Sequence, residues 1–220
     1  MVGSSASQGR MVGGRTCLDF VNTVSPREQG YAPEAVQDML PDYAALVAWS
    51  EQAGVVSPSV AMRLRAEARR RPKAARRAHA RAIALRESLY RIFEAIALRR
   101  TPREADMRVL MARFAAGARR AGIARDSAGQ FGWGWDGRAR SLGVPTWAAA
   151  RSALDLLVSP ELERVKRCPG QGDCGWLFFD SSKNASRRWC SMETCGTVAK
   201  VAVRQRRHSR SRVGRSPASR

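Results

Sequence analysis

Apolar side chains recur at helical spacing along much of the first two thirds of the chain. Over residues 73–100 the apolar positions fall mostly three or four residues apart, which predicts one long helix. The positions that carry this pattern are Ile83, Leu85, Leu89, Ile92, Phe93, Ile96 and Ala97. Two shorter helices precede it. The first begins after a cap at Asp42 and ends at Gly54, and the second begins after Ser57 and is broken by Pro72.

After this long helix the sequence predicts one more helix and then changes to the alternating pattern of a strand. The Thr101–Glu104 spacing is a capping box, which predicts another helix. In residues 129–136, aromatic residues alternate with glycine and polar residues, which predicts a strand with the aromatic side chains on one face. These side chains are Phe131, Trp133 and Trp135. A turn leads to a return strand at 141–145, and Thr146 caps the next helix.

These elements predict a mainly α-helical fold with a small β-hairpin (α+β), followed by a C-terminal four-cysteine zinc module with a basic helix. The chain has 220 residues, of which 44% are hydrophobic, which is enough to bury a core. We divide it into a flexible leader at 1–14, a helical N-terminal domain at 15–160, the cysteine module at 161–210 and a disordered basic tail at 211–220.

The charge of the chain narrows the choice of partner. It has 39 lysine and arginine residues against 19 aspartate and glutamate residues, a formal net charge of +20. Eight basic residues and no acidic residue lie between Gly196 and Arg220. This excess favours polyanions, nucleic acid first. The first ten residues lack an apolar signal segment, and no run of about 20 apolar residues is present. We therefore expect a cytoplasmic chain with no membrane partner, nucleoid-associated if it binds DNA.

Four of the five cysteines form two pairs with the spacing C-x5-C, fifteen residues, C-x4-C. Disulfides are rare in the cytoplasm, and short-spaced cysteine pairs are typical of tetrahedral zinc. We therefore expect one structural Zn²⁺ with four ligands, Cys168, Cys174, Cys190 and Cys195. A filled ligand set leaves no position for a catalytic water. Two disulfides, buried free thiols and a redox or catalytic thiol are the alternatives.

The segment between the cysteine pairs predicts a short strand. In GWLFFD, residues 175–180, Trp176 and Phe178 fall on one face and Leu177 and Phe179 on the other. Trp176, Phe178 and Trp189 are expected to form the small core of the module. Aromatic residues interleaved with arginine can also stack on unpaired bases, so an RNA-binding module is an alternative.

A basic helix is predicted from Thr194 onward. Its basic stripe consists of Lys200, Arg204 and Arg207. A different face, expected to pack on the module, consists of Val198, Val201 and Ala202. A helix that zinc fixes at its start can lie in or across a DNA groove. The candidate nucleic-acid contacts are Arg187, Arg188, Lys200, Arg204, Arg206, Arg207 and Arg210. A solvated basic tail without specific contacts is the alternative.

The N-terminal domain contains candidates for ligand binding. Asp19 and Asn22 lie among apolar residues in LDFVNT, where buried hydrogen bonds are the first expectation and ligand contact the second. Trp133 and Trp135 can wall a ligand pocket, although an aromatic stripe is more often core. The sequence has no phosphate-binding loop, dinucleotide fingerprint, zinc-protease motif or convincing triad, so we do not expect an enzyme.

The cysteine segment also resembles a known family. RCPGQGDCGWLFFDSSKNASRRWCSMETCG, residues 167–196, is similar to the CGNR zinc finger of bacterial stress-induced transcription regulators. TCLDFVNTV at 16–24, GWGWD at 132–136 and ARSALDLL at 150–157 resemble the domain that precedes this finger. The resemblance implies that the four cysteines bind the metal and that double-stranded DNA is the partner. It also implies a regulatory N-terminal domain with an unknown small-molecule inducer.

The chain departs from the family signature. Cys-Gly-Asn-Arg is here Cys195-Gly196-Thr197-Val198, so a DNA contact made by that Asn-Arg pair does not carry over. The first cysteine pair is also one residue longer than usual. The leading interpretation is a zinc-finger transcription regulator. The alternatives are a zinc-stabilised RNA-binding protein, or a small-molecule-binding or enzymatic N-terminal domain with a structural zinc appendage.

Overall fold

The computed structural model describes residues 11–27, 36–125, 129–134, 141–170 and 174–201. The α-helices of the helical domain are α1 (Thr16–Val21), α2 (Tyr43–Gln52), α3 (Pro58–Arg70), α4 (Pro72–Ala97), α5 (Glu104–Ala118) and α6 (Val144–Leu157). The strands form antiparallel pairs: β1 (Val24–Ser25) with β2 (Gln37–Asp38), β3 (Gly122–Arg125) with β4 (Phe131–Gly134), and β5 (Val165–Arg167) with β6 (Leu177–Phe179). The prediction of a mainly helical fold with small antiparallel sheets is confirmed.

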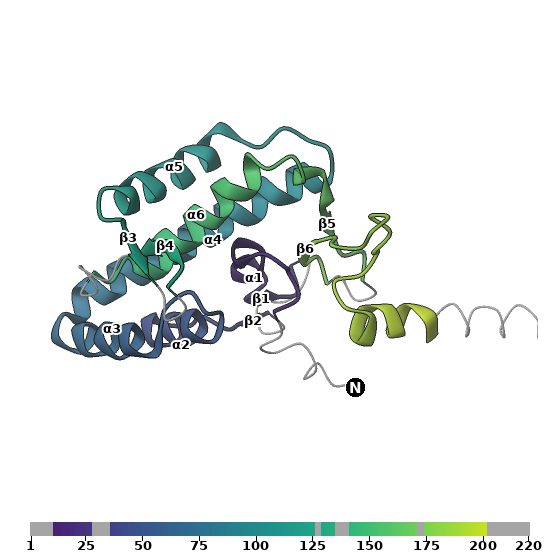
Figure 1. The fold of residues 1–220 in the computed structure, drawn as a ribbon. Coiled ribbons are helices and arrows are strands. Elements are labelled where there is room, and N and C mark those ends of the chain that lie inside the picture. Colours follow the sequence, from purple (N-terminus) through teal and green to yellow (C-terminus); the bar gives the residue numbers. More distant parts are fainter. Residues whose placement is uncertain (1–10, 28–35, 126–128, 135–140, 171–173, 202–220) are drawn as a thin grey trace, which may run out of the picture.

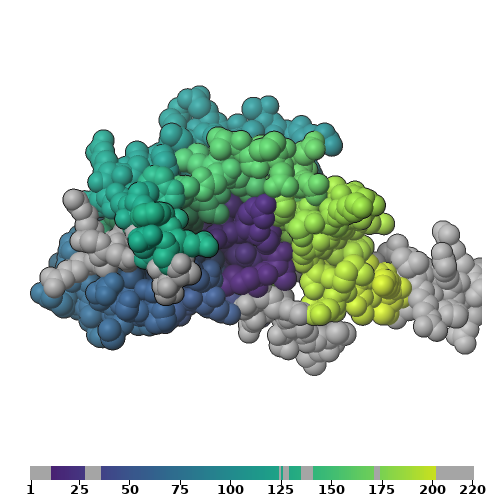
Figure 2. Space-filling view, viewed as in Figure 1, coloured from purple at the N-terminus to yellow at the C-terminus, as the bar shows by residue number. Residues whose placement is uncertain are grey.

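The long helix α4 is the axis of the fold (Figure 1). Helices α5 and α6 pack along it, and α2 and α3 lie against its N-terminal end. The short helix α1 contacts α4, α6 and β6. The N-terminal segment therefore lies between the helical body and the C-terminal cysteine module, as the purple surface in Figure 2 shows. None of the helices in the described ranges is long and apolar enough to cross a bilayer.

The buried face of α4 changes from small to large side chains along its length. Alanines are buried in the first half, and larger apolar residues in the second half are fully inside the core. The large residues are Leu85, Leu89, Ile92 and Phe93. Burial of each such side chain contributes about 1.5–3 kcal/mol, so the second half of α4 anchors the core. The helix spans 72–97, close to the predicted 73–100.

Two of the predicted helix N-caps are confirmed, and a third is wrong. The Asp42 carboxylate accepts the Ala45 N–H at 2.8 Å, and Ser57 Oγ accepts the Val60 N–H at 3.4 Å, as N-cap side chains do. The predicted capping box at Thr101 is wrong. Helix α5 begins at Glu104 with Arg103 at its N-cap and no side-chain cap, so α5 starts two residues later than the box requires.

The predicted partner of the aromatic strand is also wrong. β4 pairs with the preceding β3, with Ile123 opposite Trp133, and residues from Val144 onward are helical. Trp147 explains the difference, because a Cβ at Gly117 or at Gly143 would lie 2.7 Å or 2.6 Å from its side chain. This close packing fixes the start of α6 against α5. The expected cap by Thr146 is therefore wrong too, since Gly143 is the N-cap.

The aromatic face of β4 is not core. Phe131 is 72% exposed and Trp133 is 56% exposed, each beside an arginine guanidinium. Trp135 lies outside the described residues. The strand therefore presents its aromatic side chains to solvent, contrary to the expectation that such a stripe packs inside.

A buried arginine holds the β1–β2 ribbon on α4. Arg86 is 3% exposed and donates to both carboxylate oxygens of Asp38 at 2.7 Å and to Thr23 Oγ1 at 3.2 Å. Its neighbour Glu87 pairs with Arg27 at 2.6 Å. Burial raises the pKa of Glu87, but the charges of Arg27 and Arg86 outweigh it and lower that pKa. The network anchors the N-terminal segment beside the cysteine module.

Candidate metal centre

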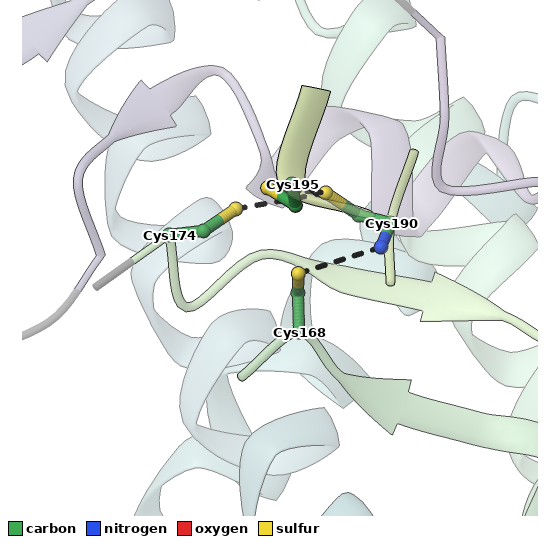
Figure 3. Close-up of side chains that lie close together, drawn as sticks. All are labelled: Cys168, Cys174, Cys190 and Cys195. Carbon is green, nitrogen blue, oxygen red and sulfur yellow. Dashed lines mark hydrogen bonds between the residues drawn. The ribbon is translucent and has the colours of Figure 1, made fainter. Parts of the chain in front are cut away.

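The four predicted cysteines converge at one point (Figure 3). Their sulfur atoms all lie within 4.8 Å of one another, and Cys190 Sγ lies 3.6 Å from the sulfurs of both Cys174 and Cys195. A tetrahedral zinc ion with Zn–S distances of about 2.3 Å requires sulfur separations of about 3.8 Å. A disulfide requires about 2.05 Å. The spacing therefore fits one metal ion and excludes disulfides, and all five cysteines are free thiols.

The β5–β6 hairpin and a wide helical turn position the sulfurs. Cys168 follows β5, and its N–H donates to Trp176 O at 2.8 Å across the hairpin. The Cys190 N–H donates to Cys168 Sγ at 3.4 Å, which bridges the two cysteine pairs. The π-helical turn η4 (Met192–Gly196) carries Cys195 and opens a helix through residue 201.

The turn after Cys168 closes over the sulfurs. A Cβ at Gly170 would lie 2.8 Å from Cys174 Cβ and 3.2 Å from Cys195 Sγ, so the backbone needs glycine there. Residues 171–173 lie outside the described residues. Cys168 and Cys190 are buried, and the other two are half-buried. Four thiol ligands around a cradle of this size are the donor set of a structural zinc.

The two faces of β6 lie in different cores. Trp176 and Phe178 are buried with the cysteines, whereas Leu177 and Phe179 join the core of the helical domain. The predicted division of the strand is therefore confirmed. Because Trp176 and Phe178 are 4% and 0% exposed, they are not available to stack on RNA bases.

The carboxylate of Asp180 holds together the loop that leads to Cys190. This carboxylate is fully buried and accepts Lys166 Nζ at 2.6 Å, Ser182 Oγ at 2.6 Å and the Arg187 N–H at 2.9 Å. Burial raises the pKa of Asp180, but these hydrogen bonds outweigh it and lower that pKa to about 2. Asp180 thus organises the loop before Cys190. The sequence signal was an acidic residue followed by two serines at a strand end, which sequence reasoning did not use.

Arg187 is part of the fold of the module. Its guanidinium donates to Trp189 O at 2.9 Å, to Val12 O at 3.2 Å and to Cys190 O, and it lies 4.7 Å from the centre of the Phe178 ring. These bonds use the donors that a phosphate contact would need. The structure places this predicted nucleic-acid contact within the folded module.

The other predicted nucleic-acid contacts are divided between the surface and the tail. Arg188 and Lys200 are exposed. Arg204, Arg206, Arg207 and Arg210 lie outside the described residues. Two of the three residues predicted to pack on the module do not, because Val198 and Val201 are 50% and 49% exposed. The third, Ala202, lies outside the described residues. Ala199 is buried instead, together with Gly196, so these small residues face the module.

The motif LDFVNT joins the module to the helical domain. Asn22 is buried, donates to Leu177 O at 2.7 Å and accepts the Leu177 N–H at 2.9 Å. Trp176 Nε1 donates to Val24 O at 2.8 Å. Asp19 accepts the Gly13 N–H at 2.7 Å, and burial raises the pKa of Asp19 to about 6. The described bonds of Asp19 and Asn22 are thus made within the protein.

The module also contacts the second half of α4. Tyr90 Oη donates to Gly175 O at 3.2 Å, and Arg167 Nε donates to Glu94 Oε1 at 3.0 Å. Together with the bonds to Asn22, these contacts bind the module to two elements of the helical domain. The position of the metal site relative to α4 is therefore set by direct hydrogen bonds.

Comparison with protein families agrees with this architecture. Residues 14–160 match the ABATE family, described as "putative stress-induced transcription regulator". The chain belongs to the ABATE family. Residues 164–208 match the CGNR zinc finger, so the resemblance drawn from the cysteine segment is confirmed. A search of curated proteins gives no match. In this ABATE chain the finger carries four convergent cysteines, the site of one structural zinc ion.

Proposed function

We propose that this ABATE-family protein is a transcription regulator whose zinc finger binds double-stranded DNA. The observation that carries the proposal is the helix at 192–201. Cys195 ties its first turn to the metal site, and its small residues Gly196 and Ala199 are buried. The side chains from Thr197 to Val201 are exposed apart from Ala199. A helix held in this way is suited to contact a DNA groove.

Charge supports a phosphate-binding role for this part of the chain. Lys200 is exposed on the helix, and Arg188 is exposed on the loop before Cys190. The tail that follows the helix adds the arginines at 204, 206, 207 and 210 to the proposed contacts. Each phosphate contact releases counterions, so we expect DNA binding to weaken steeply as salt is raised. We leave Arg187 out of the contact set because its donors bind backbone carbonyls.

The residues that replace the signature Asn-Arg pair define the proposed base contacts. Thr197 Oγ1 donates to Met192 O at 2.9 Å, which ties this hydroxyl to the preceding turn. Val198 and Val201 are exposed beside it and can contact thymine methyl groups. We infer that phosphate contacts supply most of the affinity and that base discrimination is weaker than an Asn-Arg pair would give.

We propose a binding protein that acts in the cytoplasm on the nucleoid and has no catalytic role. The absence of a catalytic role is supported by the metal site, in which protein sulfurs fill all four positions and leave none for a reactive water. The buried positions of Trp176 and Phe178 favour duplex DNA over single-stranded RNA as the partner.

The test combines metal analysis with DNA binding by fluorescence anisotropy at fixed salt. We expect about one zinc per chain in the wild-type protein and loss of both zinc and DNA binding in Cys190→Ser, because metal ligation and folding of the finger are coupled. Cys17→Ala is the matched control, since Cys17 is a buried thiol in α1 outside the metal site. Wild-type DNA affinity in zinc-free Cys190→Ser would refute the finger as the DNA-binding element.

A further inference from the structure

A cavity of about 590 Å³ opens in the helical domain. It lies between the first turns of α4, the last turns of α5 and the segment that begins α6. In Figure 1 these turns are at the end of the domain opposite the finger. Five arginines line the cavity and no acidic residue is among its described lining residues: Arg71, Arg77, Arg81, Arg113 and Arg120.

Most of this charge has no acidic partner among the residues that the structure describes. Three of the arginines form no ion pair with a described residue: Arg77, Arg81 and Arg113. Arg71 pairs with Glu67 at 3.2 Å. Arg77 and Arg81 are one helical turn apart on α4 and both are exposed. Like charges at this spacing repel one another, and a bound anion removes the repulsion.

The start of α6 adds a positive end to the same cavity. Its N-cap Gly143 supplies no side-chain cap, and Gly143 and Thr146 both line the cavity. Pro145 has no N–H, and the N–H groups of Val144 and Trp147 donate to Ser141 O and Gly143 O. The attraction for an anion here therefore comes from the positive end of the helix dipole. Trp147 forms an aromatic wall, with the Arg120 guanidinium 5.6 Å from its ring centre. The cavity thus combines several guanidinium groups, a helix N-terminus and an aromatic ring.

We propose that this cavity binds a small polyphosphate anion, such as the polyphosphate group of a nucleotide-sized metabolite. One guanidinium group can donate two parallel hydrogen bonds to the oxygens of a phosphate. A cavity of this volume fits a small organic ligand. The recessed shape favours a small anion over a DNA backbone, whose phosphates lie on the outside of a convex duplex. Binding itself is independent of the finger, but its role as an effector rests on the proposed function.

Helix α4 connects the cavity to the finger. Arg77 and Arg81 line the cavity from its first half, and Tyr90 and Glu94 contact the finger from its second half. Thirteen residues of helix separate Arg77 from Tyr90 along the sequence, a rise of about 20 Å. One continuous helix therefore carries both sites.

The test uses the full-length, zinc-loaded protein and inorganic tripolyphosphate as the probe in isothermal titration calorimetry. We expect saturable binding at one site per chain. Replacing both guanidinium groups in Arg77→Ala/Arg81→Ala should weaken it by at least about tenfold, because two charge-assisted contacts are lost. Arg76→Ala is the matched control, since Arg76 is exposed on the same helix and does not line the cavity. It should change the affinity by less than about twofold.

A parallel titration with duplex DNA distinguishes a site for a small anion from a contact with the DNA backbone. The double variant should bind a duplex with near wild-type affinity if the cavity takes a small anion. An equal loss of duplex and tripolyphosphate affinity would overturn the proposal in favour of a DNA-backbone contact. So would an equal effect of Arg76→Ala, or the absence of saturable binding. Saturable tripolyphosphate binding by a protein that fails to bind DNA would uphold the cavity and contradict the proposed function instead.

Discussion

The bond between Asn22 and β6 offers the sharpest test of how the finger is held. β6 pairs with β5 along one edge, and Asn22 meets the backbone of Leu177 with both a donor and an acceptor. Asn22→Ala removes both partners and leaves a buried N–H and a buried C=O. Each unsatisfied group costs about 1–3 kcal/mol, so the range is about 2–6 kcal/mol. We expect about 3 kcal/mol, because water can enter the space left by the amide.

The assay is urea unfolding of the zinc-loaded protein, followed by tryptophan fluorescence. The matched control is Asn184→Ala, the same substitution at an exposed position of the finger. We expect the control to change the free energy of unfolding by less than about 0.5 kcal/mol, as surface substitutions usually do. A loss in Asn22→Ala as small as that of the control would refute the idea that this side chain couples the finger to α1.

Three further predictions address acidity, the metal turn and the DNA contacts. Burial raises the folded-state pKa of Asp19 from 3.8 to about 6. The free energy of unfolding of the wild type, relative to that of Asp19→Asn, should therefore fall as the pH rises from about 4 to about 6. An NMR titration that gives Asp19 a pKa near 4 would contradict this. Gly170→Ala should weaken zinc binding by about tenfold or more in a chelator competition, because the added Cβ would meet Cys174. Gly132→Ala is the control and should leave zinc binding unchanged, because nothing lies within 4 Å of the added Cβ. Lys200→Ala should lower the slope of log affinity against log salt by about 0.9 for duplex DNA, and an unchanged slope would remove Lys200 from the phosphate contacts.

The local features of the site could be predicted from the sequence. The cysteine spacing indicated the metal site because all four ligands lie on one short segment. The alternation in GWLFFD placed Trp176 and Phe178 with the cysteines and Leu177 and Phe179 on the other core, since a strand alternates its faces whatever surrounds it. The two N-caps with local side-chain bonds were also predictable.

The remaining features depend on contacts between distant segments. The bond from Asn22 to Leu177 joins residues 155 positions apart, and no local pattern reveals it. The partner of β4 was missed because the packing of Trp147 against two glycines makes the alternative segment helical. Arg187 has the same charge as Arg188, and only the fold shows that its donors are used inside. The arginines of the cavity come from α4 and α5 and the residues next to them, so they form no motif in the sequence.

We propose that one zinc ion holds the finger in the form that binds DNA. The most direct measurement follows DNA binding by fluorescence anisotropy while zinc is removed by a chelator and then restored. We expect DNA binding to disappear when the metal is removed and to return fully with one equivalent of zinc per chain. Full DNA affinity in the metal-free protein, or recovery that needs several equivalents, would contradict it.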